Sequence, residues 1–142
     1  MNHRVKNWLT AYAVAAVIFA VLDAVWILGV ANPLYRSTIG DLLAEKTNFV
    51  AAVLFYVIFV AGMVHFGIRP QHSEATLRQR IAGAALFGFF TYATWALTGL
   101  AVLRDFPALV AVTDILWGAA ACSIVTWLTA GILRRRLASR VP

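Results

Sequence analysis

The sequence predicts an all-α integral membrane protein built as a bundle of four membrane-spanning helices. Of its 142 residues, 62% are hydrophobic and 13% are charged, and the mean hydropathy is +0.81. A soluble domain has about 45–50% apolar and about 25% charged residues. The hydrophobic residues form four long runs that lack the alternation of strands. Because lipid offers the backbone no hydrogen-bond partner, runs of this kind are expected to be helices.

Each of the four runs is long enough to cross a bilayer, whose hydrocarbon core needs about 20 helical residues. We expect spans at about residues 8–30, 48–68, 81–103 and 108–133, within a single transmembrane domain that covers residues 1–142. The basic N-terminus and the run after it resemble a signal peptide in outline. The run is too long for one and contains an acidic residue, so we expect it to be retained as the first helix.

The positively charged residues predict which ends of the helices face the cytoplasm, because Lys and Arg are enriched in cytoplasmic connections. Nine of them lie on the side of both termini, and three lie on the opposite side. The nine are Arg4, Lys6, Arg69, Arg78, Arg80, Arg134, Arg135, Arg136 and Arg140, and the three are Arg36, Lys46 and Arg104. We therefore expect both termini to be cytoplasmic.

The first connection, residues 31–47, has a pattern of its own. Pro33 is expected to block direct continuation of the first helix. Beyond it, apolar residues such as Tyr35 and Ile39 recur at roughly helical spacing, which predicts a short amphipathic helix at the outer interface. The third connection, residues 104–107, is so short that the third and fourth spans must be antiparallel neighbours.

Two acidic residues lie inside the apolar runs, where an ionisable group is costly. Asp23 occurs in VLDAVW (residues 21–26) and Asp114 in VTDILWG (residues 112–118), each three residues before a tryptophan. Asp23 precedes the end of the first span by seven residues, and Asp114 follows the start of the fourth by six. At 1.5 Å per residue, both lie roughly 9–10 Å below the outer boundary.

If the first and last spans touch, the two carboxylates can meet at one depth. Two interpretations stay open. The acids line a polar pocket that opens to the outer side, or each is hydrogen-bonded by a tryptophan, a threonine or the backbone and only locks the bundle. Thr98 lies at a similar depth, and Arg104 lies just above the acids and could pair with them. The candidate ligand-binding residues are Asp23, Trp26, Thr98, Arg104, Asp114 and Trp117.

The third span has two further patterns. Thr91, Thr94 and Thr98 share one face, and threonines in membrane helices often bond a carbonyl of their own helix or a neighbouring helix. Ala84 and Gly88 form a pair of small residues four apart, which is typical of a helix-packing face.

Several classes of function lack support. The net charge of +6 comes from basic residues at the ends of the apolar runs, so we expect no nucleic-acid partner. Cys122 is the only cysteine, and His65 has no second ligand near it, so we expect no metal site. No phosphate-binding glycine loop, nucleophile elbow or zinc-protease motif occurs, and no cofactor is implied.

Four segments resemble a family of bacterial predicted membrane proteins catalogued as domain of unknown function 2177. They are LDAVWILGV, YRSTIGDLLAEKTNFVAAVLFYVIFVAG, YATWALTGLAVLRDFP and VTDILWG. The resemblance covers about residues 12–131 and implies four transmembrane helices in a bacterial inner membrane, without an established activity. The family pattern has an Asp and an Asn in the third helix where this chain has Ala96 and Gly99. The resemblance therefore implies that two polar side chains are missing from the site region.

Three functions follow as hypotheses. The first is binding of a lipid-like or small amphipathic ligand in the outward-facing pocket. The second is a structural or accessory role in a larger membrane complex or a homo-oligomer. The third is an acid/base enzyme acting on membrane lipids, with an aspartate as the proton-transfer group. No motif establishes an enzyme, and membrane lipids are the one partner common to all three.

Overall fold

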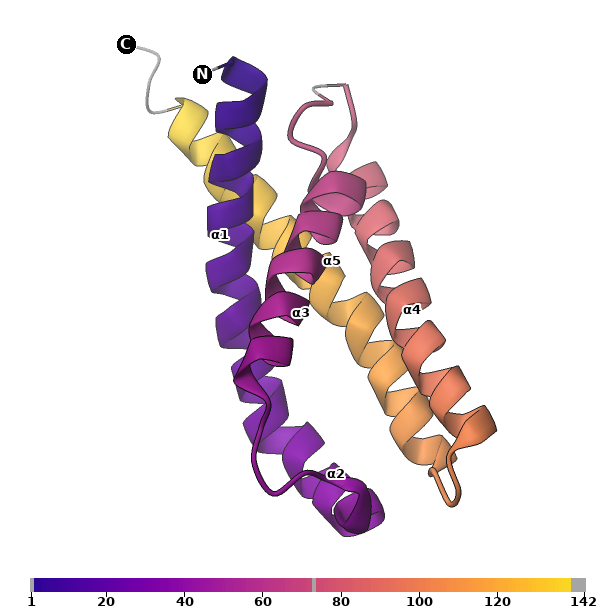
Figure 1. Ribbon diagram of the computed structural model, residues 1–142. Coiled ribbons are helices and arrows are strands. Elements are labelled where there is room, and N and C mark those ends of the chain that lie inside the picture. Colours follow the sequence, from indigo (N-terminus) through magenta and orange to yellow (C-terminus); the bar gives the residue numbers. More distant parts are fainter. Residues whose placement is uncertain (1, 73, 139–142) are drawn as a thin grey trace.

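The computed structural model describes residues 2–72 and 74–138, and these ranges contain helices and no strand. Four helical stretches are long and apolar enough to cross a membrane, which confirms the predicted four-helix membrane fold. They are His3–Leu42, Phe49–Ile68, Leu77–Val102 and Ala108–Arg136. Both termini lie at one end of the bundle (Figure 1), called the terminus end below. The opposite end holds the short helix α2 and is called the α2 end.

The first helical stretch continues beyond the predicted end of its span. It consists of α1 (His3–Trp26), a π-helical segment (Ile27–Ala31), α2 (Asn32–Ile39) and a 3-10 turn (Gly40–Leu42). The expectation that Pro33 interrupts the helix was wrong. Just before the proline, the N–H of Asn32 bonds the carbonyl of Ile27, five residues back. This wider turn accommodates a residue that has no N–H to donate and a ring that needs space.

The other helices are α3 (Phe49–Gly62), its π-helical continuation (Met63–Ile68), α4 (Leu77–Val102) and α5 (Ala108–Ala138). Side-chain caps set two of their starts. Asn48 accepts a hydrogen bond of 3.1 Å from the N–H of Ala51, and Thr76 and Gln79 form a reciprocal capping box. The predicted boundaries therefore differ by a few residues, because local capping rather than hydropathy decides where a helix begins.

Helices α4 and α5 form an antiparallel pair joined by the predicted short connection (Figure 1). Glycines bring the two backbones together. A Cβ atom built on Gly88 would lie 2.0 Å from the carbonyl oxygen of Gly118, and one built on Gly118 would lie 2.4 Å from the Tyr92 ring. The small-residue face predicted at Ala84 and Gly88 is therefore a packing face, since Ala84 is fully buried.

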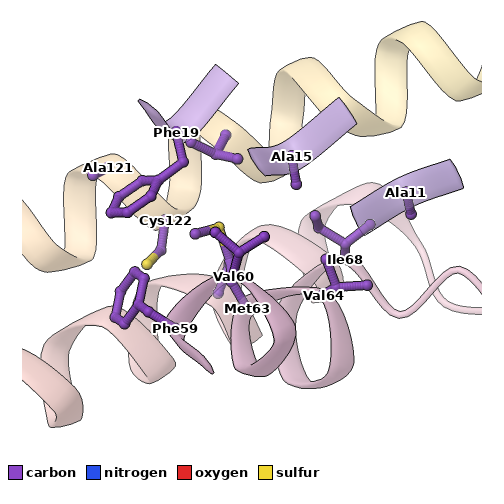
Figure 2. Close-up of a cluster of buried hydrophobic side chains, with 12 residues drawn as sticks. Ala11, Ala15, Phe19, Phe59, Val60, Met63, Val64, Ile68, Ala121 and Cys122 are labelled. Carbon is purple, nitrogen blue, oxygen red and sulfur yellow. The ribbon is translucent and has the colours of Figure 1, made fainter. Parts of the chain in front are cut away.

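The main core lies where α1, the end of α3 and α5 meet. Figure 2 shows side chains from all three converging, with Phe19 from α1, Phe59 and Met63 from the second span, and Cys122 from α5. Phe19 and Phe59 lie with their ring centroids 5.1 Å apart. Cys122 is fully buried and contributes as a small apolar side chain.

A second, smaller cluster places α2. Ile39 is buried against residues of α4, the following connection and α5, and Leu34 and Tyr35 pack on the same group. The remaining members are Ala96, Phe106, Val110 and Ala111. The predicted short helix is therefore present, and its apolar face covers the ends of α4 and α5. This contact is what brings Tyr35 to the fourth span.

The glycine contact between α4 and α5 gives a first prediction. Gly88→Ala should push the two helices apart and lower stability by about 1–3 kcal/mol, the usual cost of overpacking. Thermal unfolding of the detergent-purified protein measures the effect. Gly131→Ala is the matched control on α5, because a Cβ at Gly131 meets nothing within 4 Å. Equal melting of both variants would contradict the close packing.

Candidate functional site

The carboxylate of Asp23 joins three helices. Tyr56 of α3 donates its hydroxyl to Oδ2 at 2.6 Å, and the indole N–H of Trp117 on α5 donates to Oδ1 at 3.1 Å. Asp23 itself lies on α1 and is 5% exposed. Both carboxylate oxygens therefore have a donor, and each donor comes from a different helix. Interhelical hydrogen bonds of this kind contribute about 0.6 kcal/mol on average and up to about 1.7 kcal/mol within a membrane.

Trp117 also stacks on Trp26, one turn beyond Asp23 on α1. The ring centroids are 4.3 Å apart and the ring planes differ by 3°. Stacking fixes the plane of the indole, so its N–H is directed at the carboxylate in a defined geometry. The Asp-x-x-Trp spacing in each span thus has a structural meaning. The aspartate of the first span binds the tryptophan of the fourth, and the two tryptophans stack.

Asp114 has a separate partner. The hydroxyl of Tyr35 on α2 donates a hydrogen bond to its Oδ2, and Asp114 is 4% exposed. Trp95 of α4 lies close enough to interact with both Tyr35 and Asp114. Trp95 is therefore a second partner of Asp114, and its side chain is 55% exposed. Tyr56 and Trp117, the partners of Asp23, are both partly buried, so the two acids differ in how accessible their partners are.

Asp23 and Asp114 lie one helical turn apart along the same side of α5. Asp114 and Trp117 are three residues apart on α5, so Asp23, which binds Trp117, lies one turn from Asp114 along that helix. The first and fourth spans therefore touch, which was the condition for the two acids to meet. No hydrogen bond joins the two carboxylates among the described residues. Each acid instead has its own tyrosine.

Two of the candidate residues lie apart from this arrangement. Thr98 is exposed, and its hydroxyl bonds carbonyls of its own helix at Thr94 and Trp95, the latter at 3.0 Å. Arg104 is exposed in the connection between α4 and α5. Within residues 2–72 and 74–138, neither Arg104 nor Arg36 forms an ion pair with the acids. Arg36 instead bonds the side chain of Asn32 at 3.4 Å.

Ala96 and Gly99 lie in apolar surroundings. Ala96 is fully buried in the cluster with Ile39 and Val110. A Cβ built on Gly99 would make ordinary contact with the Phe106 ring at 3.5 Å. Where the family pattern implies an Asp and an Asn, this chain therefore packs α2 and Phe106 against α4. The polar part of its site is limited to Asp23, Asp114 and their partners.

Sequence reasoning missed the tyrosines. The sequence patterns place Tyr35 only on an interfacial helix and give Tyr56 no role. The depth argument that matched the two acids was sufficient to find Tyr56, because it lies seven residues into a span that starts at Phe49 on the same side. No comparable signal existed for Tyr35, whose position depends on the π-helical turn before α2.

The comparisons with known proteins agree with this architecture. Residues 8–131 match the family model described as Predicted membrane protein (DUF2177). The chain belongs to this family. No curated protein matches the chain, and no solved structure matches it. Membership thus establishes a predicted membrane protein family with four candidate spans in this member, and the assignment of a function depends on the chain's own chemistry.

The Asp23 hydrogen bonds give a second prediction. Asp23→Leu leaves the Tyr56 hydroxyl and the Trp117 N–H without an acceptor, which should cost about 1–3 kcal/mol for each unsatisfied donor. Asp23→Asn keeps one acceptor and should cost less. Thermal unfolding of the purified protein compares the two, with Thr98→Val as a control expected to stay within about 0.5 kcal/mol. A Leu variant as stable as the Asn variant would show that the carboxylate does not hold the helices.

Proposed function

We propose that the protein binds an amphipathic, lipid-like molecule through the Asp114–Tyr35 pair. The observation that supports this is the difference between the two acids. Both partners of Asp23 are partly buried, whereas Trp95, one of the two partners of Asp114, is 55% exposed, so the head group of a ligand can replace it. A buried polar group normally has its hydrogen bonds satisfied. In this proposal Asp23 positions Trp117 and the helices, and Asp114 contacts the ligand.

The chemistry around Asp114 limits the head group. A carboxylate and a phenol oxygen accept hydrogen bonds, so the preferred head carries hydroxyl or amino donors. Trp95 is 55% exposed beside the pair and presents an aromatic face to the surrounding lipid. A molecule arriving from within the bilayer meets these features together.

An accessory role in a larger membrane complex is the second candidate. One observation favours it, which is that both acids already have partners inside the chain. Such acids can serve only to lock the bundle. The two candidates differ in what Asp114 does. A locking residue affects stability alone, whereas a binding residue affects ligand retention at unchanged stability.

Native mass spectrometry of the protein purified in mild detergent separates the two. We expect the native chain and Asp23→Asn to retain one bound amphiphile, because the Asp114 acceptor is intact in both. Asp114→Asn should lower the fraction of protein that carries a bound amphiphile at least about tenfold, because one good charge-assisted hydrogen bond contributes roughly 1.5–3 kcal/mol. Melting temperatures of the variants provide the folding control. Absence of any retained amphiphile, together with a stoichiometric protein partner, would favour the accessory role.

We also propose that this protein resides in a bacterial inner membrane with both termini cytoplasmic, so that the Asp114 site opens outward. The uneven division of basic residues between the two ends supports this orientation. Single-cysteine labelling tests it, because Cys122 is fully buried and should give little background. Lys46→Cys should react with a membrane-impermeant maleimide on intact cells, and His72→Cys should react only after permeabilisation. The reverse pattern would contradict the orientation.

A further inference from the structure

We propose that the terminus end of the bundle contains a second, independent site that binds one anionic phospholipid. A cavity of about 740 Å³ lies there between the start of α1, the segment around Ile68 and Pro70, the start of α4 and the last turns of α5. Its volume is in the range of about 300–1,000 Å³ that small-molecule sites occupy. The cavity is far along the bundle from the Asp114 site, so neither site depends on the other.

The residues that line this cavity favour a negatively charged ligand. Four basic residues face it, Lys6 from α1, Arg80 from α4, and Arg134 and Arg136 from α5. No acidic residue is among the described residues that line it. Like charges gathered in this way repel one another, and an anion between Lys6 and Arg134 lowers that repulsion. Arginine and lysine are the residues that bind phosphate groups, and basic pockets between membrane helices bind lipid head groups.

Three of the basic residues, Arg80, Lys6 and Arg134, have different tasks. The guanidinium of Arg80 donates to backbone carbonyls, including those of Arg69 at 2.6 Å and Ala75 at 3.1 Å, so it mainly holds the wall of the cavity. Lys6 and Arg134 are exposed, and neither forms an ion pair within residues 2–72 and 74–138. These two side chains therefore supply the charge that a phosphate can bind.

A second hollow continues from this cavity and matches an acyl chain. It has a volume of about 590 Å³ and shares Lys6, Thr10 and Arg136 with the first. Apart from these shared residues its lining is apolar, and it follows α1 as far as Val17 and Ile18.

The length of this groove indicates a lipid rather than a soluble anion. At 1.5 Å per residue, Lys6 to Val17 spans roughly 16 Å, which is about half of a hydrocarbon core of about 30 Å and therefore one leaflet. A charged head cavity joined to a groove one leaflet deep suits a phospholipid with a net negative charge.

Lipid titration of the full chain in nonionic detergent, followed by native mass spectrometry, tests the head group. Phosphatidylglycerol should bind at least about tenfold more tightly than phosphatidylcholine. The double variant Lys6→Gln with Arg134→Gln should weaken phosphatidylglycerol binding about 20-fold, given the contribution of each basic residue at an anionic surface. The matched control, Arg4→Gln with Arg78→Gln, removes the same charge from exposed positions at the same end that do not line the cavity.

The groove is tested by Ala13→Phe, which fills the apolar hollow without changing charge. This variant should weaken phosphatidylglycerol binding about tenfold while melting like the native protein. Three results would overturn the proposal: equal affinity for the two lipids, an equal loss in the control pair, or unchanged lipid binding by Ala13→Phe. Displacement of the lipid by millimolar inorganic phosphate would likewise overturn it, because it would identify a free anion as the occupant.

Discussion

A carboxylate inside hydrocarbon must receive hydrogen bonds from other parts of the chain, and the rest of this structure depends on how Asp23 receives them. Its two donors come from α3 and α5, so satisfying one side chain fixes three helices relative to one another. The stacking of Trp26 on Trp117 supports this arrangement, because it holds the indole N–H in the direction of the carboxylate. Asp23, whose carboxylate is energetically unfavourable in hydrocarbon, thereby specifies the register of the first, second and fourth spans.

The segment VTDILWG (residues 112–118) makes three contacts that hold α5 in the bundle. Asp114 accepts the hydroxyl of Tyr35, Trp117 donates to Asp23, and Gly118 allows α4 to approach closely. The three residues contact α2, α1 and α4 respectively, so the segment contacts most of the bundle. This segment lies in the first third of α5, the longest α-helix, which crosses from α4 to α1 (Figure 1).

Hydropathy was sufficient to predict the four spans, and the short third connection was sufficient to predict the α4–α5 pair. These features follow from the bilayer thickness and from helical rise, which depend little on neighbouring side chains. The tyrosine partner of Asp114 was not predictable in the same way. Tyr35 reaches it because a π-helical turn lets the helix continue through Pro33, and such a turn has no simple sequence pattern. The convergence of Lys6 and Arg134 on one cavity likewise requires the packing of α1 against α5.

The separation of Asp23 from its donors in the chain has a consequence for biosynthesis. Tyr56 follows it by 33 residues and Trp117 by 94. At roughly 5–20 residues per second, the ribosome completes the first donor within a few seconds and the second only after roughly 5–20 seconds. During that interval the nascent first helix holds an incompletely satisfied acid next to lipid. The hydrogen bonds of Asp23 are therefore complete only when the last helix has entered the membrane.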